Sequence, residues 1–356
     1  MKILHIAPNN TAGVPITMVR AERALGHDSR LVTLQRDPRG YEEDLCLELP
    51  GWEPQMLLLF RRLTGRRERG GGLPREAKPA AIPPRWKAGG PLANTLIKLR
   101  DRLARKVVIQ AVARHGLDRY DVYQLDGGHG FLKYDNFVAR WHAAGKKVIC
   151  CYLGSDLRVR GVMPGIEAIS DCNVSCEWDH LDLHPKIEHV WFPFDASSVP
   201  PAAPAARPRL RIGHSPSNRK LKGSDRIIAA VENLAKKHPV DLVLIEGLPH
   251  AEALGLKATC DIGVDQLGDL GYGISALEWL AMAVPVATSI ARRMASAVTD
   301  HPFIAIDEDS IETQLERLIL DQSLRRTVGE QGQDWLRRHH DAVAVVKRIH
   351  QLAGLA

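Results

Sequence analysis

The stretch that decides the fold is RIGHSPSNRKLKGSDRIIAAVENL, residues 211–234. It begins with an apolar run that predicts a strand and ends with a periodic segment that predicts a helix opening at residues 223–225. The loop between them carries Asn218 and the three basic side chains of Arg219, Lys220 and Lys222. Such a loop is either an ordinary solvated turn or an anion site. Its position, after a strand and before the free N–H groups of a helix start, favours the anion site.

The same alternation of apolar strands and helices extends through most of the chain. In the second half, strands are predicted at 210–216, 240–247, 261–267 and 285–290, and helices at 224–238, 250–260 and 274–283. The tail from Ser310 is expected to be helical, with breaks near Gly329 and Gly332. In the first half, strands are predicted at 2–8, 29–35, 121–128, 147–156 and 171–177, and helices at 16–27, 94–112 and 136–146. This pattern is typical of α/β proteins with parallel sheets covered by helices on both faces.

A Pro- and Ala-rich stretch interrupts the pattern and divides the chain. We expect one domain over residues 1–196, a linker over 197–208 and a second domain over 209–356, whose last helix packs back on the first domain. Two such units facing each other would form a cleft that closes about the linker.

The net charge of +6 is concentrated in one segment. Residues 61–92 contain nine Lys or Arg and two acids, so they carry +7 and the rest of the chain carries about −1. Because this segment is also rich in Gly and Pro, we expect a mobile insert. The basic helix that follows either lies on an anionic membrane, through residues 61–110, or is a solvated face. Nucleic acid is not favoured as a partner, because aromatic residues are only 5% and no recognition motif is present.

Composition also bears on location and metal content. No run approaches the roughly 18 apolar residues of a membrane span, and the first apolar run is too short for a signal peptide. The six cysteines are scattered, as expected for reduced thiols, and Cys172 and Cys176 lack zinc-site spacing and a second pair. We therefore expect a cytoplasmic protein, peripheral to the inner face of the membrane, with no metal.

A glycine-rich loop, DQLGDLGYGIS at residues 265–275, precedes another helix and predicts a second part of the same site. Glycines allow a ligand to approach the backbone, and the N–H groups of Gly273, Ile274 and Ser275 are expected to face an anion. Glu278 lies one turn into the helix, where a carboxylate accepts hydrogen bonds from ribose hydroxyls. The alternative for Glu278 is an ordinary surface glutamate.

Four segments together resemble a GT-B glycosyltransferase of the retaining, family 4 type. They are KILHIAPNNTAGVP, YLGSDLR, HSPSNRKLKGSDRII and CDIGVDQLGDLGYGISALEWLAMAVPVA, and the resemblance covers nearly all of the chain except the basic insert. It implies two Rossmann-like domains, with the acceptor held by the first and a nucleoside diphosphate sugar by the second. It also implies that no metal or other cofactor is needed, and no DxD motif is found at a strand end.

The resemblance assigns roles to particular residues. Arg219 and Lys222 match the basic pair that neutralises the diphosphate, and Glu278 matches the last Glu of the E-x7-E motif, which holds the ribose. The donor site as a whole is expected to comprise Asn218, Arg219, Lys222, Asp265, Gln266, Gly271, Tyr272, Gly273, Ile274, Ser275 and Glu278. On the acceptor side we expect Gly13, Val14, Ser155 and Arg158, with Asp156 and His129 joining Arg219 and Lys222 as catalytic candidates.

Asp156 and His129 also have structural alternatives. Asp156 is as well suited to a cap or turn as to orienting the acceptor hydroxyl, and a lone His in a Gly loop is as often structural.

Two positions depart from the family pattern. The first acid of E-x7-E falls at Leu270, with Asp269 and the Asp265–Gln266 pair as nearby substitutes, and Leu153 stands where relatives commonly carry a His. These departures affect the donor sugar and the activity rather than the fold.

The expected function is transfer of a sugar from a UDP- or GDP-sugar to a hydroxyl acceptor by a hexosyltransferase-type enzyme. Cell-surface polysaccharide, glycolipid or glycoconjugate synthesis is the expected setting. The main alternative is a catalytically weakened GT-B protein that binds nucleotide sugar as a partner or regulatory subunit. A nicotinamide dehydrogenase is disfavoured, because APNNTAGVP lacks the G-x-G-x-x-G spacing.

Overall fold

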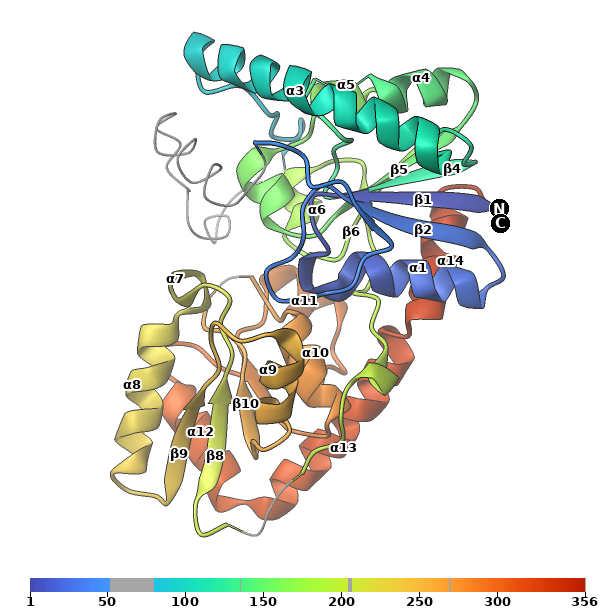
Figure 1. The fold of residues 1–356 in the computed structure, drawn as a ribbon. Coiled ribbons are helices and arrows are strands. Elements are labelled where there is room, and N and C mark those ends of the chain that lie inside the picture. The colour runs from blue at the N-terminus through green and yellow to red at the C-terminus, as the bar shows by residue number, and fades with distance from the viewer. Residues whose placement is uncertain (52–79, 135, 204–206, 269, 356) are drawn as a thin grey trace. The chain divides into compact units, whose positions relative to one another are not determined.

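The computed structural model describes residues 1–51, 80–134, 136–203, 207–268 and 270–355, and it divides into two compact units (Figure 1). One unit holds the described residues up to Pro193 together with those from Ala342 onward, and the other holds the described residues from Phe194 to Asp341. Each unit is built on one parallel sheet flanked by helices. The predicted α/β class, with two parallel sheets covered by helices, is therefore confirmed.

The sheet of the first unit has seven parallel strands in the order β3-β2-β1-β4-β5-β6-β7. Their bounds are β1 Lys2–Ala7, β2 Asp28–Thr33, β3 Leu45–Cys46, β4 Val122–Asp126, β5 Lys147–Tyr152, β6 Cys172–Ser175 and β7 Ile187–His189. The helices are α1 Val14–Ala24, α3 Pro91–His115, α4 Phe137–Ala143, α5 Pro164–Glu167, α6 His180–Leu183 and α14 Ala342–Leu352. α1 and α14 lie on one face of the sheet, and α3 and α4 lie on the other (Figure 1).

The sheet of the second unit has five parallel strands in the order β12-β11-β10-β8-β9. Their bounds are β8 Leu210–His214, β9 Val240–Leu244, β10 Ile262–Val264, β11 Val286–Thr288 and β12 Ile304–Ala305. The helices are α7 Arg219–Lys222, α8 Ser224–Ala235, α9 His250–Lys257, α10 Ile274–Ala281, α11 Arg292–Ala297, α12 Ile311–Leu320 and α13 Gln322–His339. The sequence did not predict β3, β7 or β12, because two or three residues are too few to show a period.

Packing of α10 against the sheet positions the candidate site of the second unit. The Trp279 ring is fully buried and lies over Gly213 in β8 and Gly263 in β10. A Cβ atom at Gly263 would lie 2.5 Å from the indole, and one at Gly213 would lie 2.9 Å from it. Only glycine allows this approach, so the two glycines seat α10, and with it Glu278, close to the strand ends.

The expected breaks at Gly329 and Gly332 are wrong. The tail forms α12, α13 and α14, with interruptions at Asp321 and His340, and α13 runs unbroken through both glycines. A Cβ at Gly329 would lie 2.0 Å from the Ala283 carbonyl oxygen, and one at Gly332 would lie 2.8 Å from Leu280. These glycines therefore allow α13 to pack closely on α10, and the backbone entropy they cost is offset by that packing.

This packing gives a stability prediction. Gly329→Ala should lower the free energy of unfolding by about 1–3 kcal/mol, because the added methyl group overlaps a backbone carbonyl. Gly255→Ala in α9 is the matched control, since a Cβ there meets nothing within 4 Å. It should raise the free energy of unfolding by up to about 1 kcal/mol through helix propensity. Urea titrations of the two variants check this, and equal effects of the same sign would contradict it.

Parts of the insert and linker predicted from the sequence are held by neighbouring structure. Residues 61–79 of the insert lie outside the described residues, but Arg85 forms a parallel bridge with Val162 and the Trp86 ring is buried. In the linker, the Ala203 N–H donates to the Ala258 carbonyl at 2.8 Å. Within the described residues, no helix combines the length and the apolar character that crossing a bilayer requires.

Candidate functional site

The structure brings together three predicted site residues that lie far apart in the sequence. The Lys222 ammonium, at the end of α7, donates to Asp265 Oδ1 at 3.0 Å, and Asp265 directly follows β10. The other carboxylate oxygen of Asp265 accepts the Gly273 N–H at 2.9 Å, at the start of α10. Because Asp265 is buried, the ion pair and the N–H together stabilise its charge. These contacts place a lysine at the carboxyl ends of β8 and β10, beside the N-terminus of α10.

The backbone around Lys222 is held in one conformation. Asn218 caps α7 by accepting the Leu221 N–H at 3.2 Å, and Gly223 ends that helix with φ +64°. A Cβ at Gly223 would lie 2.4 Å from the Leu267 carbonyl oxygen, while the Leu267 N–H donates to the Lys222 carbonyl at 3.0 Å. The Lys222–Gly223 step therefore requires glycine for both its conformation and its close contact.

Arg219 lies on the same short helix but is directed elsewhere. Its guanidinium makes three hydrogen bonds of 2.6–3.1 Å to the Glu246 carboxylate after β9. These bonds raise the pKa of Arg219 and lower that of Glu246. The pair is solvent-exposed, so the arginine can exchange Glu246 for another anion at little cost.

Glu278 is buried, and both of its carboxylate oxygens have partners from α9. Oε2 pairs with the buried Lys257 ammonium, and Oε1 is 2.7 Å from His250 Nε2. Burial by itself would raise the pKa of Glu278, but Lys257 and His250 together lower it, so the carboxylate is ionised. Lys257 also donates to Ser275 Oγ at 2.7 Å and lies 4.9 Å from the centre of the Trp279 ring.

The sequence reasoning missed both Lys257 and His250. The sequence feature that could have indicated them is their spacing of seven residues, which places both side chains on one face of α9. His250 is the more exposed of the two partners of Glu278, so a ligand hydroxyl would approach from its side.

The glycine loop differs in part from what was expected. The Gly273 N–H is already bound to Asp265. The N–H groups of Ile274 and Ser275, the first two residues of α10, have no partner among the described residues, as is usual where a helix begins. Gly271 has φ +81°, and the buried Tyr272 ring stacks on Phe303 with centroids 4.8 Å apart, while its hydroxyl group is 3.1 Å from His340 Nε2. Tyr272 therefore anchors the loop in the core. Gln266 is buried, Leu270 is partly buried, and Asp269 lies outside the described residues.

In the first unit, Asp156 binds its own backbone. Its carboxylate accepts the N–H groups of Leu153, Gly154 and Leu157 at 2.7–2.9 Å, which holds the loop after β5. These contacts are those expected of a residue that holds a turn, which is the structural alternative for Asp156. Ser155, next to it, is exposed.

The other candidates of the first unit lie in segments that follow the carboxyl ends of β5, β4 and β1. Arg158 is paired with Glu177 at 2.7 Å and Asp179 at 2.5 Å, which raises its pKa despite burial. His129 is buried with Nδ1 2.7 Å from the Gly130 carbonyl, and burial holds its pKa well below the usual range. Gly13 precedes α1 with φ +72°, and Val14, the first residue of that helix, is buried.

A buried polar network of the first unit was not expected from the sequence. His5 in β1 lies between Asp126, 2.9 Å from Nδ1, and Glu22, 3.0 Å from Nε2. Glu22 also contacts His350 of α14 at 3.0 Å and Ser29 at 2.5 Å. The two carboxylates outweigh the effect of burial and raise the pKa of His5 to about 10, while that of Glu22 falls to about 2. The network therefore joins β1, β4, α1 and α14 through buried charges.

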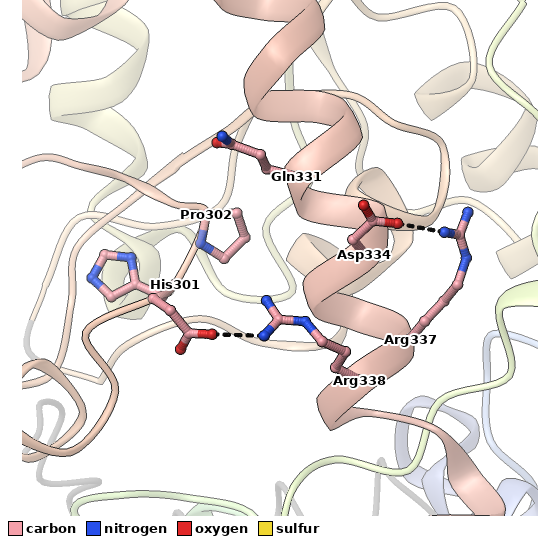
Figure 2. Close-up of a pocket in the computed structure, with 7 residues that line it drawn as sticks. His301, Pro302, Gln331, Asp334, Arg337 and Arg338 are labelled. Atoms are coloured by element: carbon pink, nitrogen blue, oxygen red, sulfur yellow. Dashed lines mark hydrogen bonds and ion pairs between the residues drawn. The ribbon is translucent and has the colours of Figure 1, made fainter.

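A cavity of about 770 Å³ in the second unit lies apart from these residues. Figure 2 shows that His301 and Pro302 face Gln331, Asp334, Arg337 and Arg338 of α13 across it. Asp334 is paired with Arg337 and Asp300 with Arg338, so its arginines are already neutralised. None of the predicted site residues lines this cavity. In the described part of the chain, no three His, Cys, Asp or Glu side chains are placed to hold a metal ion.

The two parallel sheets with their helices have the GT-B fold that the sequence led us to expect. The catalytic domain of starch synthase IV from Arabidopsis thaliana, bound to ADP and acarbose, is similar with a TM-score of 0.64 and 10% identity over 99% of each chain. Sucrose-phosphate synthase from Thermosynechococcus elongatus has a TM-score of 0.57 and 14% identity over 99% of this chain and 98% of its own. HepE from Anabaena, in complex with UDP-glucose, has a TM-score of 0.57 and 11% identity over all of both chains.

Comparison of the sequence itself identifies no relative. No protein-family model matches the chain, and no curated protein is significantly similar to it.

Proposed function

We propose that this protein is a glycosyltransferase that moves a sugar from a nucleoside diphosphate sugar to a hydroxyl acceptor. The observation that carries the proposal is the position of Lys222, whose ammonium lies beside Asp265 at the N-terminus of α10. A pyrophosphate bound there would meet the ammonium and the N–H groups of Ile274 and Ser275. UDP-glucose in HepE and ADP in starch synthase IV, which share the fold, support a nucleotide-sugar donor here.

The proposed mechanism depends on charge at the leaving group. When the bond from the sugar to the diphosphate breaks, negative charge grows on the phosphate, and Lys222 and the helix N–H groups stabilise it. Arg219 joins them after releasing Glu246. The acceptor hydroxyl attacks the oxocarbenium-like sugar from the face that the phosphate leaves, so configuration is retained. The departing phosphate takes the hydroxyl proton, and no protein base is required.

We further propose that the donor is a UDP- or GDP-hexose and that the reaction needs no metal ion, because Lys222 and the helix start supply the positive charge. The product would belong to a cell-surface polysaccharide, a glycolipid or another glycoconjugate. The proposed location is cytoplasmic and peripheral to an anionic membrane. The basic character of residues 61–110 supports that location.

A second candidate function is binding of a nucleotide sugar without transfer, by a partner or regulatory subunit. It is favoured by Leu153 and Leu270, which stand where members of the family that the sequence resembles carry a His and an acid. It is also favoured by Asp156 and His129, because both make hydrogen bonds to backbone groups of their own loops.

A thermal-shift screen with UDP-, GDP-, ADP- and TDP-sugars tests the donor site, and release of the nucleoside diphosphate then separates the two functions. A glycosyltransferase should be stabilised by one donor and should release its diphosphate faster when an acceptor is added. Stabilisation without release would favour the binding subunit. No shift with any nucleotide, and none with the diphosphates alone, would refute both.

A further inference from the structure

The long helix α3, Pro91–His115, has apolar side chains on two opposite sides. Ile97, Ala104 and Val108 are buried against the first unit. Leu92, Leu99 and Leu103 follow one another at spacings of seven and four residues, so at about 100° per residue they share the other side. Their exposed fractions are 72%, 54% and 61%. The helix lies along the outside of its sheet (Figure 1). The exposed fractions show that the described part of the chain leaves these leucines largely uncovered.

Basic side chains run beside the leucines. Lys98, Arg102 and Lys106 are exposed and recur every four residues, next to the leucine stripe. Within the described residues none of the three has a carboxylate partner, and Lys98 lies 5.9 Å from the centre of the Tyr134 ring. The one acid of α3, Asp101, is buried and accepts hydrogen bonds from Arg100 and from the Tyr134 N–H. The outer face of the helix is therefore apolar and cationic, with no negative charge.

We propose that this face, formed by Leu92, Lys98, Leu99, Arg102, Leu103 and Lys106, docks α3 on an anionic lipid membrane. The helix would lie in the plane of the surface, with the leucines at the boundary between headgroups and acyl chains and the basic side chains on lipid phosphates. Charge complementarity favours this occupant. A second copy of α3 would bring the basic side chains of two helices together, which their like charges oppose. The inference refines the membrane association proposed above and does not depend on the donor chemistry.

Sedimentation of the full chain with vesicles tests the proposal, using phosphatidylcholine with and without phosphatidylglycerol. The chain should sediment only with the anionic vesicles. Leu99→Ser with Leu103→Ser should weaken the partition coefficient at least about 10-fold. Replacing Lys98, Arg102 and Lys106 by Gln should weaken it about 5-fold for each charge removed and should flatten its salt dependence. Leu320→Ser in α12 is the matched control, because Leu320 is 70% exposed but belongs to the other unit. This variant should sediment like the unaltered chain.

Two readouts keep the result interpretable. All variants change exposed side chains, so their circular dichroism and their thermal shift with nucleotide sugars should be unchanged. A variant that loses the thermal shift but keeps its circular dichroism would be altered at the donor site. Undiminished sedimentation of both α3 variants would overturn the proposal. So would equal sedimentation with both kinds of vesicle. A dimer that becomes a monomer in the leucine variant, without vesicle binding, would overturn it in favour of a second copy of the chain.

Discussion

Replacing His5 by alanine is expected to lower the free energy of unfolding of the first unit by about 3–5 kcal/mol, the cost of breaking a buried ion pair by removing one partner. The imidazolium lies between Glu22 and Asp126, and all three side chains are buried. Without the imidazolium, the negative charges of the two carboxylates repel each other in a site that is closed to solvent. Urea denaturation of the variant at pH 6 measures the loss.

Restoring neutrality should recover most of that stability. Adding Glu22→Gln and Asp126→Asn to His5→Ala removes both stranded charges, so the triple variant should be more stable than the single one. A triple variant no more stable than His5→Ala would show that lost packing, rather than stranded charge, causes the effect. His180→Ala is a useful comparison, because that buried imidazole bonds Ser175 Oγ and the Gly154 carbonyl and has a pKa lowered to about 4. It is neutral at pH 6, so its removal strands no charge.

The network also predicts how stability depends on pH. The pKa of His5 is raised from 6.5 to about 10, so its contribution is complete below pH 6.5 and is lost as the pH rises towards 10. The pKa of Glu22 is lowered from 4.5 to about 2, so its contribution is complete above pH 4.5 and is lost as the pH falls towards 2. Stability should therefore be greatest between about pH 4.5 and 6.5. In His5→Ala the decline from pH 6.5 to 10 should be absent, and an unchanged alkaline decline would contradict the assignment.

Replacing Lys222 by alanine is expected to reduce sugar transfer by about 10²–10³-fold, the usual effect of removing a group that stabilises a developing anion. Affinity for the nucleoside diphosphate should fall by about 1.5–3 kcal/mol, as for a hydrogen bond to a charged group. Single-turnover transfer and calorimetric titration with UDP and GDP measure the two effects. Lys220→Ala is the matched control, since it removes the same charge from an exposed position of α7. Equal losses in the two variants would refute the site.

The ion pair of Lys222 requires a second variant to separate binding from folding. In Lys222→Ala, the Gly273 N–H is the partner that the described residues still offer the buried Asp265 carboxylate, so part of any loss could come from a disturbed start of α10. Adding Asp265→Asn removes that stranded charge and should restore the thermal stability but not the transfer activity. If the double variant recovers transfer as well, Lys222 only neutralises Asp265 and does not bind the donor.

Much of the candidate site in the second unit could be placed from local pattern. The segment at 211–234 predicted a strand, a basic loop and a helix, and the loop at 265–275 predicted a helix start. Because parallel strands end at the same edge of a sheet, both loops had to lie there. The partners at that edge could not be predicted, since a carboxylate such as Glu278 binds whichever cation folding brings to it. That cation is Lys257 on another helix, and the exposed Arg219 binds Glu246.

The sequence by itself determined the alternation of strands and helices, the two parallel sheets and the loops at their carboxyl ends, because hydrophobic periodicity and turn residues act within a few positions. Only the tertiary structure decided the contacts between distant segments: His5 between Glu22 and Asp126, the glycines of α13 against α10, and the outer leucines of α3. In α3, two opposed apolar stripes look alike in sequence. Which stripe is buried depends on which side of α3 packs against the sheet, and this is decided only in the folded chain.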